Sequence, residues 1–282
     1  MAPINHMQKV TTDDRLSKLP NDILLAILDK LDVRDAARTS VLSRRWKQLP
    51  TMLSRLMIDV NHFLPKGVLK PSIDELVHAN AAVVEATKSI LSRRNSSQYI
   101  IHLLSMTFFL RDGDSISIGH TIGSTMTSQK VETAEFMIQT EKPETECVDD
   151  DLVDYGQQFM LFFNACPNAF GGLTRLDLEN LSFGELGVPN VLSTCTRLRD
   201  LCLYNCDSGT WTTLEVIHSQ LSELSIISCG FERVELKWLP KLTKVTFTAG
   251  TKMIKLSELL GNSSVLDLTL DFKSVKVWLH PP

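Results

Sequence analysis

The fold is decided by the stretch Leu198-Arg-Asp-Leu-Cys-Leu-Tyr-Asn-Cys206, which recurs as Leu221-Ser-Glu-Leu-Ser-Ile-Ile-Ser-Cys229. Both copies place aliphatic residues in the order L-x-x-L-x-L and end in a cysteine. A related copy begins at Leu173, so the three copies start 25 and 23 residues apart. One such segment could occur in any amphipathic strand, whereas several in tandem indicate a repeated structural unit.

The step between copies lies within the roughly 20 to 29 residues of leucine-rich repeats. Each repeat is expected to place a short strand beside the next in a parallel sheet, with its leucines in the core and the residues between them in solvent. Weaker copies begin at Phe231, Leu242 and Val265, and residues 104–109 and 131–136 fit loosely. The sequence therefore predicts an α/β solenoid with a parallel sheet over residues 96–282.

The repeats contain an acidic interruption and several cysteines. Residues 141–154 hold seven carboxylates opposed only by Lys142, so we expect a solvated loop, without the alternating ligands and turn glycine of a calcium site. Six cysteines are present, and none has the paired spacing of a zinc or redox motif. Cys206 and Cys229 are expected to be small buried residues at turns, and no cofactor or metal is predicted.

Three short helices are predicted before residue 50. The first begins at Pro20, the second runs from Asp32 to Thr39, and the third carries Trp46 and ends at Pro50, because proline cannot continue a helix. A strand over 56–60 follows. Residues 61–95 are predicted as a linker and a long amphipathic helix that starts with a capping box at Ser72.

The short helices carry more large aliphatic residues than a module of this size can bury, so a partner is implied. The alternative is that these residues rest on the following domain. The net charge of −4 and the lack of a basic arm argue against nucleic acid as a partner. No apolar run has the length of a secretory signal or a membrane span, so we expect a soluble intracellular protein.

Two stretches of the sequence resemble those of a known protein family. The first, Asp14-Arg-Leu-Ser-Lys-Leu-Pro-Asn-Asp-Ile-Leu-Leu-Ala-Ile-Leu-Asp-Lys-Leu31 with Val41-Leu-Ser-Arg-Arg-Trp-Lys-Gln-Leu49, resembles the F-box. The second, Cys229-Gly-Phe-Glu-Arg-Val-Glu-Leu-Lys-Trp-Leu-Pro-Lys-Leu242, is similar to the repeats of plant F-box/leucine-rich-repeat proteins. The resemblance implies a disordered N-terminus over 1–13, an F-box over 14–60 and repeats that follow the amphipathic helix.

The same resemblance implies a non-catalytic subunit of a Skp-cullin-F-box ubiquitin ligase. The F-box would bind a Skp-family adaptor, and through it a cullin and a RING protein, while the repeats capture a protein substrate. The residues that this resemblance assigns to the adaptor are Leu19, Pro20, Ile23, Leu24, Ile27, Leu28, Leu31, Val33, Val41, Leu42 and Trp46. Some of them must instead form the interior of the module, and Trp46 is the first candidate.

Alternation along the predicted strands gives a candidate substrate face of outward residues. Its mixed charges indicate a protein ligand, because a face that reads phosphates would be uniformly basic. The candidates are Arg175, Asp177, Glu179, Asp200, Tyr204, Glu223, Arg233, Glu235, Lys237 and Lys244, followed by Asp267 and Asp271.

Three other readings stay open from the sequence. A trihelical DNA-binding protein would use Arg44, Arg45 and Lys47, and an enzyme would need a set such as Cys202 or Cys206 with His218. An adaptor-bound scaffold or decoy would keep the F-box without ubiquitin transfer. The plant family commonly continues with a further C-terminal domain, whereas this array stops at Pro282 without a polar cap, which leaves open whether the full binding surface is present.

Overall fold

The computed structural model describes residues 18–31, 33–39, 43–68, 70–94, 100–184, 187–209, 213–248, 253–255, 267–271 and 276–278. The predicted N-terminal helices are confirmed as α1 (Asn21–Leu28), α2 (Val33–Arg38) and α3 (Arg44–Gln48). Helix α3 starts at Ser43, whose hydroxyl accepts a hydrogen bond from the Trp46 amide at 3.3 Å. It ends where Pro50 enters the 3-10 helix η3 (Leu49–Met52), as the missing amide of proline requires.

The long amphipathic helix is confirmed as α4 (Ile73–Leu91). Its capping box is present: the Ser72 amide donates to Glu75 at 2.8 Å and the Glu75 amide donates to the Ser72 hydroxyl at 3.3 Å. The expected apolar stripe faces the core, since Leu76, Ala79 and Val83 are buried. The helix is therefore fixed at its start by local hydrogen bonds and along its length by packing.

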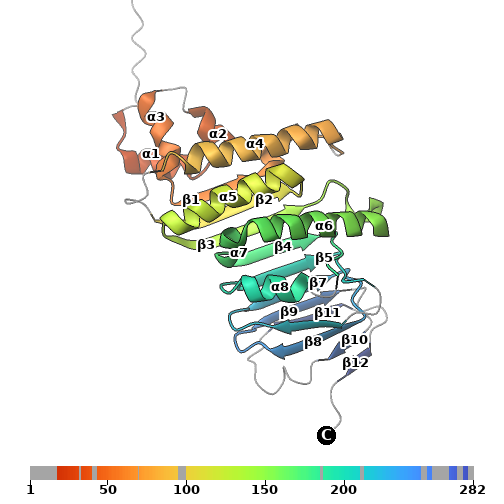
Figure 1. The fold of residues 1–282 in the computed structure, drawn as a ribbon. Coiled ribbons are helices and arrows are strands. Elements are labelled where there is room, and N and C mark those ends of the chain that lie inside the picture. The colour runs from red at the N-terminus through yellow and green to blue at the C-terminus, as the bar shows by residue number, and fades with distance from the viewer. Residues whose placement is uncertain are drawn as a thin grey trace, which may run out of the picture.

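The larger of two sheets in the structure has eight strands, which pair in parallel (Figure 1). The short strand expected after the three helices is β1. The next two strands in the sheet come from the loosely fitting upstream copies, and the strands after them come from the copies that follow. The strand order is β1 (Arg55–Asp59), β2 (Ile101–Phe109), β3 (Val131–Gln139), β4 (Arg175–Glu179), β5 (Asp200–Tyr204), β7 (Glu223–Ile227), β9 (Lys244–Thr248) and β11 (Asp267–Asp271).

A second parallel sheet has four strands, in the order β12 (Lys276–Trp278), β10 (Met253–Lys255), β8 (Arg233–Trp238) and β6 (Thr213–Ile217). From β5 onward the chain alternates between the two sheets. The expectation that the copy beginning at Phe231 adds a strand to the first sheet is therefore wrong. The leucine spacing reports only that alternate residues are buried, and a strand in either sheet meets that condition.

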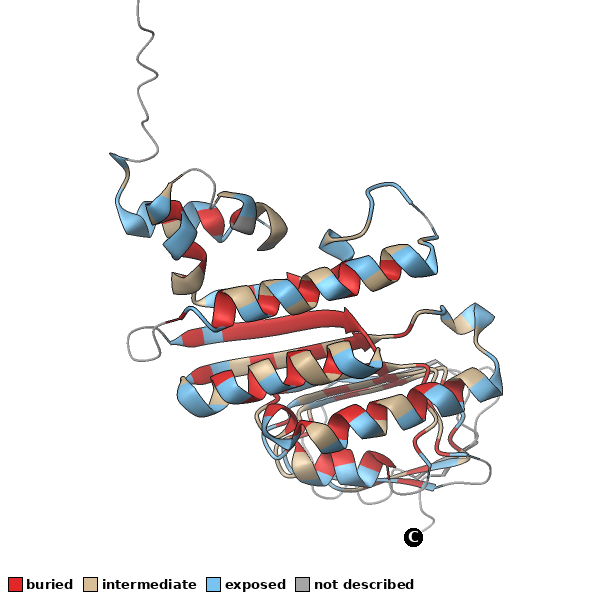
Figure 2. Ribbon diagram, turned by 45° about the horizontal axis from the view of Figure 1, so that its top comes forward, coloured by how far each residue is buried: buried red, intermediate tan, exposed pale blue. Residues whose placement is uncertain are grey.

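Helices cover one face of the large sheet over its N-terminal strands (Figure 1). They are α4, α5 (Asp112–Ser128), α6 (Asp149–Ala165), α7 (Pro167–Gly171) and α8 (Gly187–Thr194). Figure 2 shows that these helices expose one side and bury the other. A cluster of phenylalanines fills the space between them and the sheet: the rings of Phe162 and Phe170 lie 4.9 Å apart, and those of Phe108 and Phe136 lie 5.5 Å apart in an edge contact.

The acidic segment over 141–154 is not one continuous loop, which corrects the sequence prediction. It holds the 3-10 helix η5 (Glu144–Glu146) and then the start of α6 at Asp149. Asp149, Asp150 and Asp151 lie in the first turn of α6, where the positive end of the helix dipole favours carboxylates. The Asp151 carboxylate also accepts a hydrogen bond from the Val148 amide at 3.0 Å and forms an ion pair with Lys142 at 2.6 Å. Carboxylates that we expected to repel one another therefore stabilise the start of α6.

The turns that follow β4, β5 and β7 share one backbone geometry. Asn180, Asn205 and Ser228 have φ values of 56°, 49° and 52°, in the left-handed region that asparagine tolerates better than most residues. The Asn205 side-chain amide donates to the Asn180 oxygen at 2.6 Å, and the Asn180 amide donates to the Thr140 hydroxyl at 2.6 Å. Neighbouring turns are therefore linked by side-chain hydrogen bonds.

The cysteines after β5 and β7 lie in the core, as expected. Cys206 and Cys229 are buried, and the Cys206 amide donates to the Cys229 sulfur at 3.4 Å. Both thiols contact main-chain carbonyl oxygens, at 3.7 Å from Cys206 to Leu178 and 3.3 Å from Cys229 to Leu203. Burial raises the pKa of the Cys206 thiol well above its ordinary value, so the sulfur stays protonated and serves as a small packing group.

Candidate functional site

One candidate surface is the α1 face, which we define as Ile23, Ile27 and Leu31. These residues follow one another at four-residue steps along α1 and the turn after it, and their side chains are 44%, 37% and 40% exposed. Pro20 is exposed beside them and Leu19 is half-buried. Three large aliphatic side chains in one exposed row are unusual on a free surface and are typical of a protein contact.

The other residues expected to bind an adaptor divide into two groups. Leu24, Leu28 and Trp46 are almost fully buried and form the interior of the three-helix module. A side chain this buried offers little surface to a partner, so these three residues are not part of the α1 face. The side chain of Val33 and the residues Val41 and Leu42 lie outside the described residues.

A hydrogen-bonded arginine holds the α1 face in place. Arg45 on α3 donates to the Leu19 carbonyl at 2.6 Å and to the Asn21 side chain at 2.8 Å. These bonds tie the start of α1 to α3 and fix the position of Pro20. Arg45, which the DNA-binding reading assigned to phosphate contact, therefore has a structural role within the module.

The second candidate surface is the outer sheet face, defined as the outward residues of the eight-stranded sheet. Strand pairing aligns these residues in rows across the sheet. One row runs in order through Glu135, Arg175, Asp200, Glu223, Lys244 and Asp267. The next row contains Asp59, Thr107, Met137, Asp177, Cys202 and Ser225. The alternate leucines between the rows are buried, for example Leu176 and Leu201.

The structure places eight of the predicted substrate residues, Asp267 among them, at outward positions of this sheet and separates three from them. The side chain of Asp271 on β11 lies outside the described residues. Arg233, Glu235 and Lys237 belong to β8, in the other sheet. There Lys237 pairs with Glu215 of β6 at 2.5 Å, and Arg233 pairs with Glu235 at 3.6 Å. The prediction that these three residues lie on the same face as the other candidates is wrong. The spacing of buried residues does not tell in which of the two sheets a strand lies.

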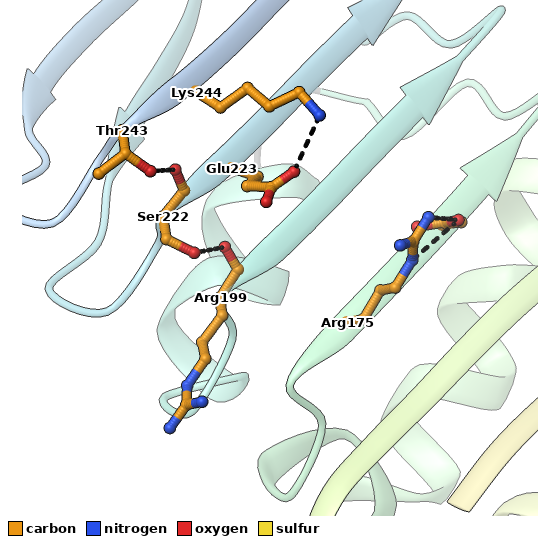
Figure 3. Close-up of polar contacts among 7 residues, drawn as sticks. Arg175, Arg199, Ser222, Glu223, Thr243 and Lys244 are labelled. Carbon is orange, nitrogen blue, oxygen red and sulfur yellow. Dashed lines mark hydrogen bonds and ion pairs between the residues drawn. The ribbon is translucent and has the colours of Figure 1, made fainter. Parts of the chain in front are cut away.

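The two cations in the row are each beside a carboxylate (Figure 3). Arg175 contacts Asp177 at 2.9 Å, and this hydrogen bond raises the pKa of the guanidinium. Lys244 contacts Glu223 at 3.3 Å. In contrast, Asp200 has a buried carboxylate oxygen without a hydrogen-bond partner. Burial and the neighbouring Glu223 raise the pKa of Asp200, so its charged form is poorly stabilised.

A hollow of about 380 Å³ opens on the outer sheet face. Its lining combines carboxylates with apolar groups and comes from β1 to β5: Asp59, Asn61, Thr107, Met137, Ile138, Gln139, Asp177, Leu178, Glu179, Cys202 and Tyr204. Asp59, Thr107, Met137 and Gln139 were not predicted from the sequence, because the upstream strands fit the repeat pattern only loosely. Extending the outward alternation to residues 131–139 would have found Met137 and Gln139.

The segment after β3 is hydrogen-bonded to two residues that line this hollow. The Tyr204 hydroxyl donates to the Glu144 carboxylate, and this bond with burial raises the pKa of Tyr204 to about 12. The Thr140 amide donates to Glu179 at 2.9 Å. Burial raises the pKa of Glu179 in spite of that bond. The η5 segment is therefore bound to the carboxyl ends of β4 and β5.

His218, the imidazole of the enzyme reading, has another partner. His218 is buried, and its Nε2 lies 3.1 Å from the Cys195 carbonyl. Cys202 lines the hollow, where burial raises the pKa of its thiol to about 11. Over the described ranges, no cluster of three metal-ligating side chains is found, and no helix is long and apolar enough to cross a bilayer.

Comparison with known proteins identifies the class of the N-terminal module. Residues 16–56 match the F-box domain, so the chain carries an F-box. This match includes the α1 face and all three short helices.

Relatives that share more of the chain are plant F-box proteins. An F-box/FBD/LRR-repeat protein of Arabidopsis thaliana is 27% identical over 232 residues, which are 78% of this chain and 49% of the relative. Another is 24% identical over 284 residues, 94% of this chain and 59% of the relative. An Arabidopsis F-box protein is 45% identical over 101 residues, 35% of this chain and 20% of the relative. The chain spans about half the length of the F-box/FBD/LRR-repeat relatives it matches.

Proposed function

We propose that this protein is the non-catalytic substrate receptor of a Skp-cullin-F-box ubiquitin ligase. The observation that carries the proposal is the α1 face, an exposed aliphatic row on a matched F-box domain. An exposed row of this kind is stabilised when a partner excludes water from it, at about 25 cal/mol for each Å² of apolar surface buried. The partner would be a Skp-family adaptor, which would join the chain to a cullin and a RING protein.

The second part of the proposal is that the parallel strands after the F-box form a leucine-rich-repeat solenoid that captures the substrate. The repeat spacing in the sequence, the alternation of the chain between two parallel sheets and the similarity to F-box/FBD/LRR-repeat proteins support it. The outer sheet face is the proposed capture surface, because most of its outward residues are polar and the hollow lies there. Repeat proteins commonly bind partners on an extended face of this kind.

This role needs no nucleophile in the chain itself. A receptor raises the effective concentration of a substrate lysine near a thioester carried by another subunit, and this positioning supplies the rate increase. The groups that could have served as a nucleophile, Cys202 and Cys206, have raised pKa values, which suits packing better than reaction.

Binding to a purified Skp-family adaptor tests the proposal. Changing Ile23→Ala with Ile27→Ala should weaken binding by about 2 kcal/mol or more, as at central positions of protein interfaces. The fold should be kept, because both side chains are substantially exposed. Isothermal titration calorimetry would measure the dissociation constant.

The matched control is Ile73→Ala, an isoleucine on α4 that is 66% exposed. This variant should bind the adaptor as the unchanged chain does. Equal affinities for all three proteins would overturn the assignment of the α1 face.

A further inference from the structure

Carboxylates outnumber cations on the outer sheet face. The outward positions of the described strands carry Asp59, Glu135, Asp177, Glu179, Asp200, Glu223 and Asp267, against Arg55, Arg175 and Lys244. Two of these cations are already paired, Arg175 with Asp177 and Lys244 with Glu223. The face therefore keeps an excess of negative charge after its internal ion pairs have formed.

Two of the carboxylates that contribute to this excess, Glu135 and Asp200, lie on central strands of the sheet. Within the described part of the chain, neither Glu135 nor Asp200 has a salt bridge, and one oxygen of Asp200 is buried without a donor. Asp200 lies in the row between Arg175 and Glu223. Its raised pKa reflects burial first and the like charge of Glu223 second. A cation brought beside this half-buried residue would offset the repulsion from Glu223 and favour the charged form of the carboxylate.

The hollow beside this row suits a long cationic side chain. Met137, Cys202 and the Tyr204 ring offer apolar surface, while Asp59, Asp177 and Glu179 place carboxylates around it. Lysine and arginine side chains bury an aliphatic stem and keep a charged end group beside polar partners. An aromatic ring adds attraction for a cation close to its face. A short acidic or purely aliphatic side chain would lack one of these two kinds of contact.

We propose that the outer sheet face binds a basic, extended segment of the captured protein, with one lysine or arginine side chain in the hollow. The inference rests on the proposed function and names the class of substrate segment that the receptor takes. Charge complementarity selects this occupant, because an acidic peptide or a nucleic acid would meet an excess of carboxylates.

The size of the face fits a short peptide. From β3 to β11 the row crosses five strand spacings of about 4.8 Å, or about 24 Å. An extended chain rises by about 3.3 Å per residue, so about seven residues would span it. Along such a chain Glu135 and Asp200 lie about three residues apart and Asp200 and Asp267 about four residues apart, within reach of long basic side chains placed at nearby positions.

A defined peptide tests this inference on the full chain in complex with its adaptor. The probe is a fluorescein-labelled synthetic peptide of alternating lysine and serine, about eight residues long, and the comparison is the same peptide with glutamate in place of lysine. Fluorescence anisotropy should show binding of the lysine peptide only. Raising the salt from about 50 mM to about 300 mM should weaken it, because exposed charges are screened.

Two isosteric double variants test whether peptide binding depends on the carboxylates of this face or only on the net negative charge of the protein. Glu135→Gln with Asp200→Asn should weaken the lysine peptide by about tenfold or more, because two charge contacts of the peptide are lost. Glu85→Gln with Asp154→Asn removes the same charge from exposed positions on α4 and α6 and should leave binding unchanged. Thermal denaturation checks that both variants remain folded.

The proposal is overturned if the two peptides bind alike or if both double variants weaken binding equally. Adaptor binding by the unchanged chain is measured in the same samples. Loss of the peptide result with adaptor binding intact would reject the basic segment while keeping the receptor role. Failure of adaptor binding would instead reject the proposed function.

Discussion

At the scale of single residues, Gly156 shows how closely the chain passes itself. A Cβ atom at this position of α6 would lie 1.8 Å from the Ser182 carbonyl oxygen. The Ser182 amide donates to the Leu152 carbonyl at 2.8 Å, one turn earlier on the same helix. The turn after β4 is therefore seated directly on α6, and only glycine leaves room for it.

We predict that Gly156→Ala destabilises the protein, because the added methyl group must displace main-chain atoms. Overpacking of this kind costs about 1 to 3 kcal/mol. Gly113→Ala, in the first turn of α5, meets no atom within 4 Å and should stabilise the helix by up to about 1 kcal/mol. Urea denaturation of the two variants should give changes in unfolding free energy of opposite sign, and a neutral Gly156→Ala would contradict the close contact.

At the scale of secondary-structure elements, the start of α6 shows what sequence could not resolve. Seven carboxylates in 141–154 suggested a solvated loop, whereas the helix dipole, the Val148 amide and Lys142 stabilise those at Asp149–Asp151. Helix α5 was missed for a different reason, since its glycines, serines and threonines are poor helix formers. Its small residues instead permit close packing, as at Gly119 beside Phe162.

Stability should depend on pH through Asp151. The hydrogen bond from Lys142 and the Val148 amide lower the pKa of its carboxyl. A lowered pKa in the folded state adds stability above the unfolded value of about 3.9, and this contribution is lost as the pH falls through the folded pKa. Asp151→Asn should therefore lower the melting temperature at pH 7, and the difference from the unchanged chain should shrink below about pH 4.

Asp150→Asn is the matched control, since it removes the same charge from the same helical turn at an exposed position. We expect a smaller loss at pH 7 than for Asp151→Asn. Equal losses at neutral pH would mean that the dipole alone, rather than the Lys142 pair, sets the contribution of Asp151.

At the scale of the whole molecule, the leucine spacing predicted the strands but not their distribution. β4, β5, β7 and β9 lie where the copies begin, and α4 and its cap were also predicted in full. The second sheet was missed because the burial of alternate residues is the same on both sides of a shared core. In α1, helical periodicity marked the apolar residues but could not tell the exposed Ile23 and Ile27 from the buried Leu24 and Leu28.

Hydrogen exchange should distinguish the two regions. The three-helix module is small and its helices are short, whereas β2 and β3 are long paired strands that are almost fully buried, so we expect faster amide exchange in α1 than in β3. Adding a Skp-family adaptor should slow exchange in α1 and leave β3 unchanged. If α1 in the isolated chain is already as protected as β3, the module does not need a partner to cover it.

The alternation between β7, β8 and β9 makes each circuit of the chain equivalent in space. Leu221 and Leu242 begin successive circuits, and their strands pair directly as β7 and β9. Duplicating residues 221–241 would therefore insert one whole layer without altering the residues above or below it. The molecule could be lengthened in steps of one strand spacing, about 4.8 Å, and the reach of its polar face adjusted by the same increment.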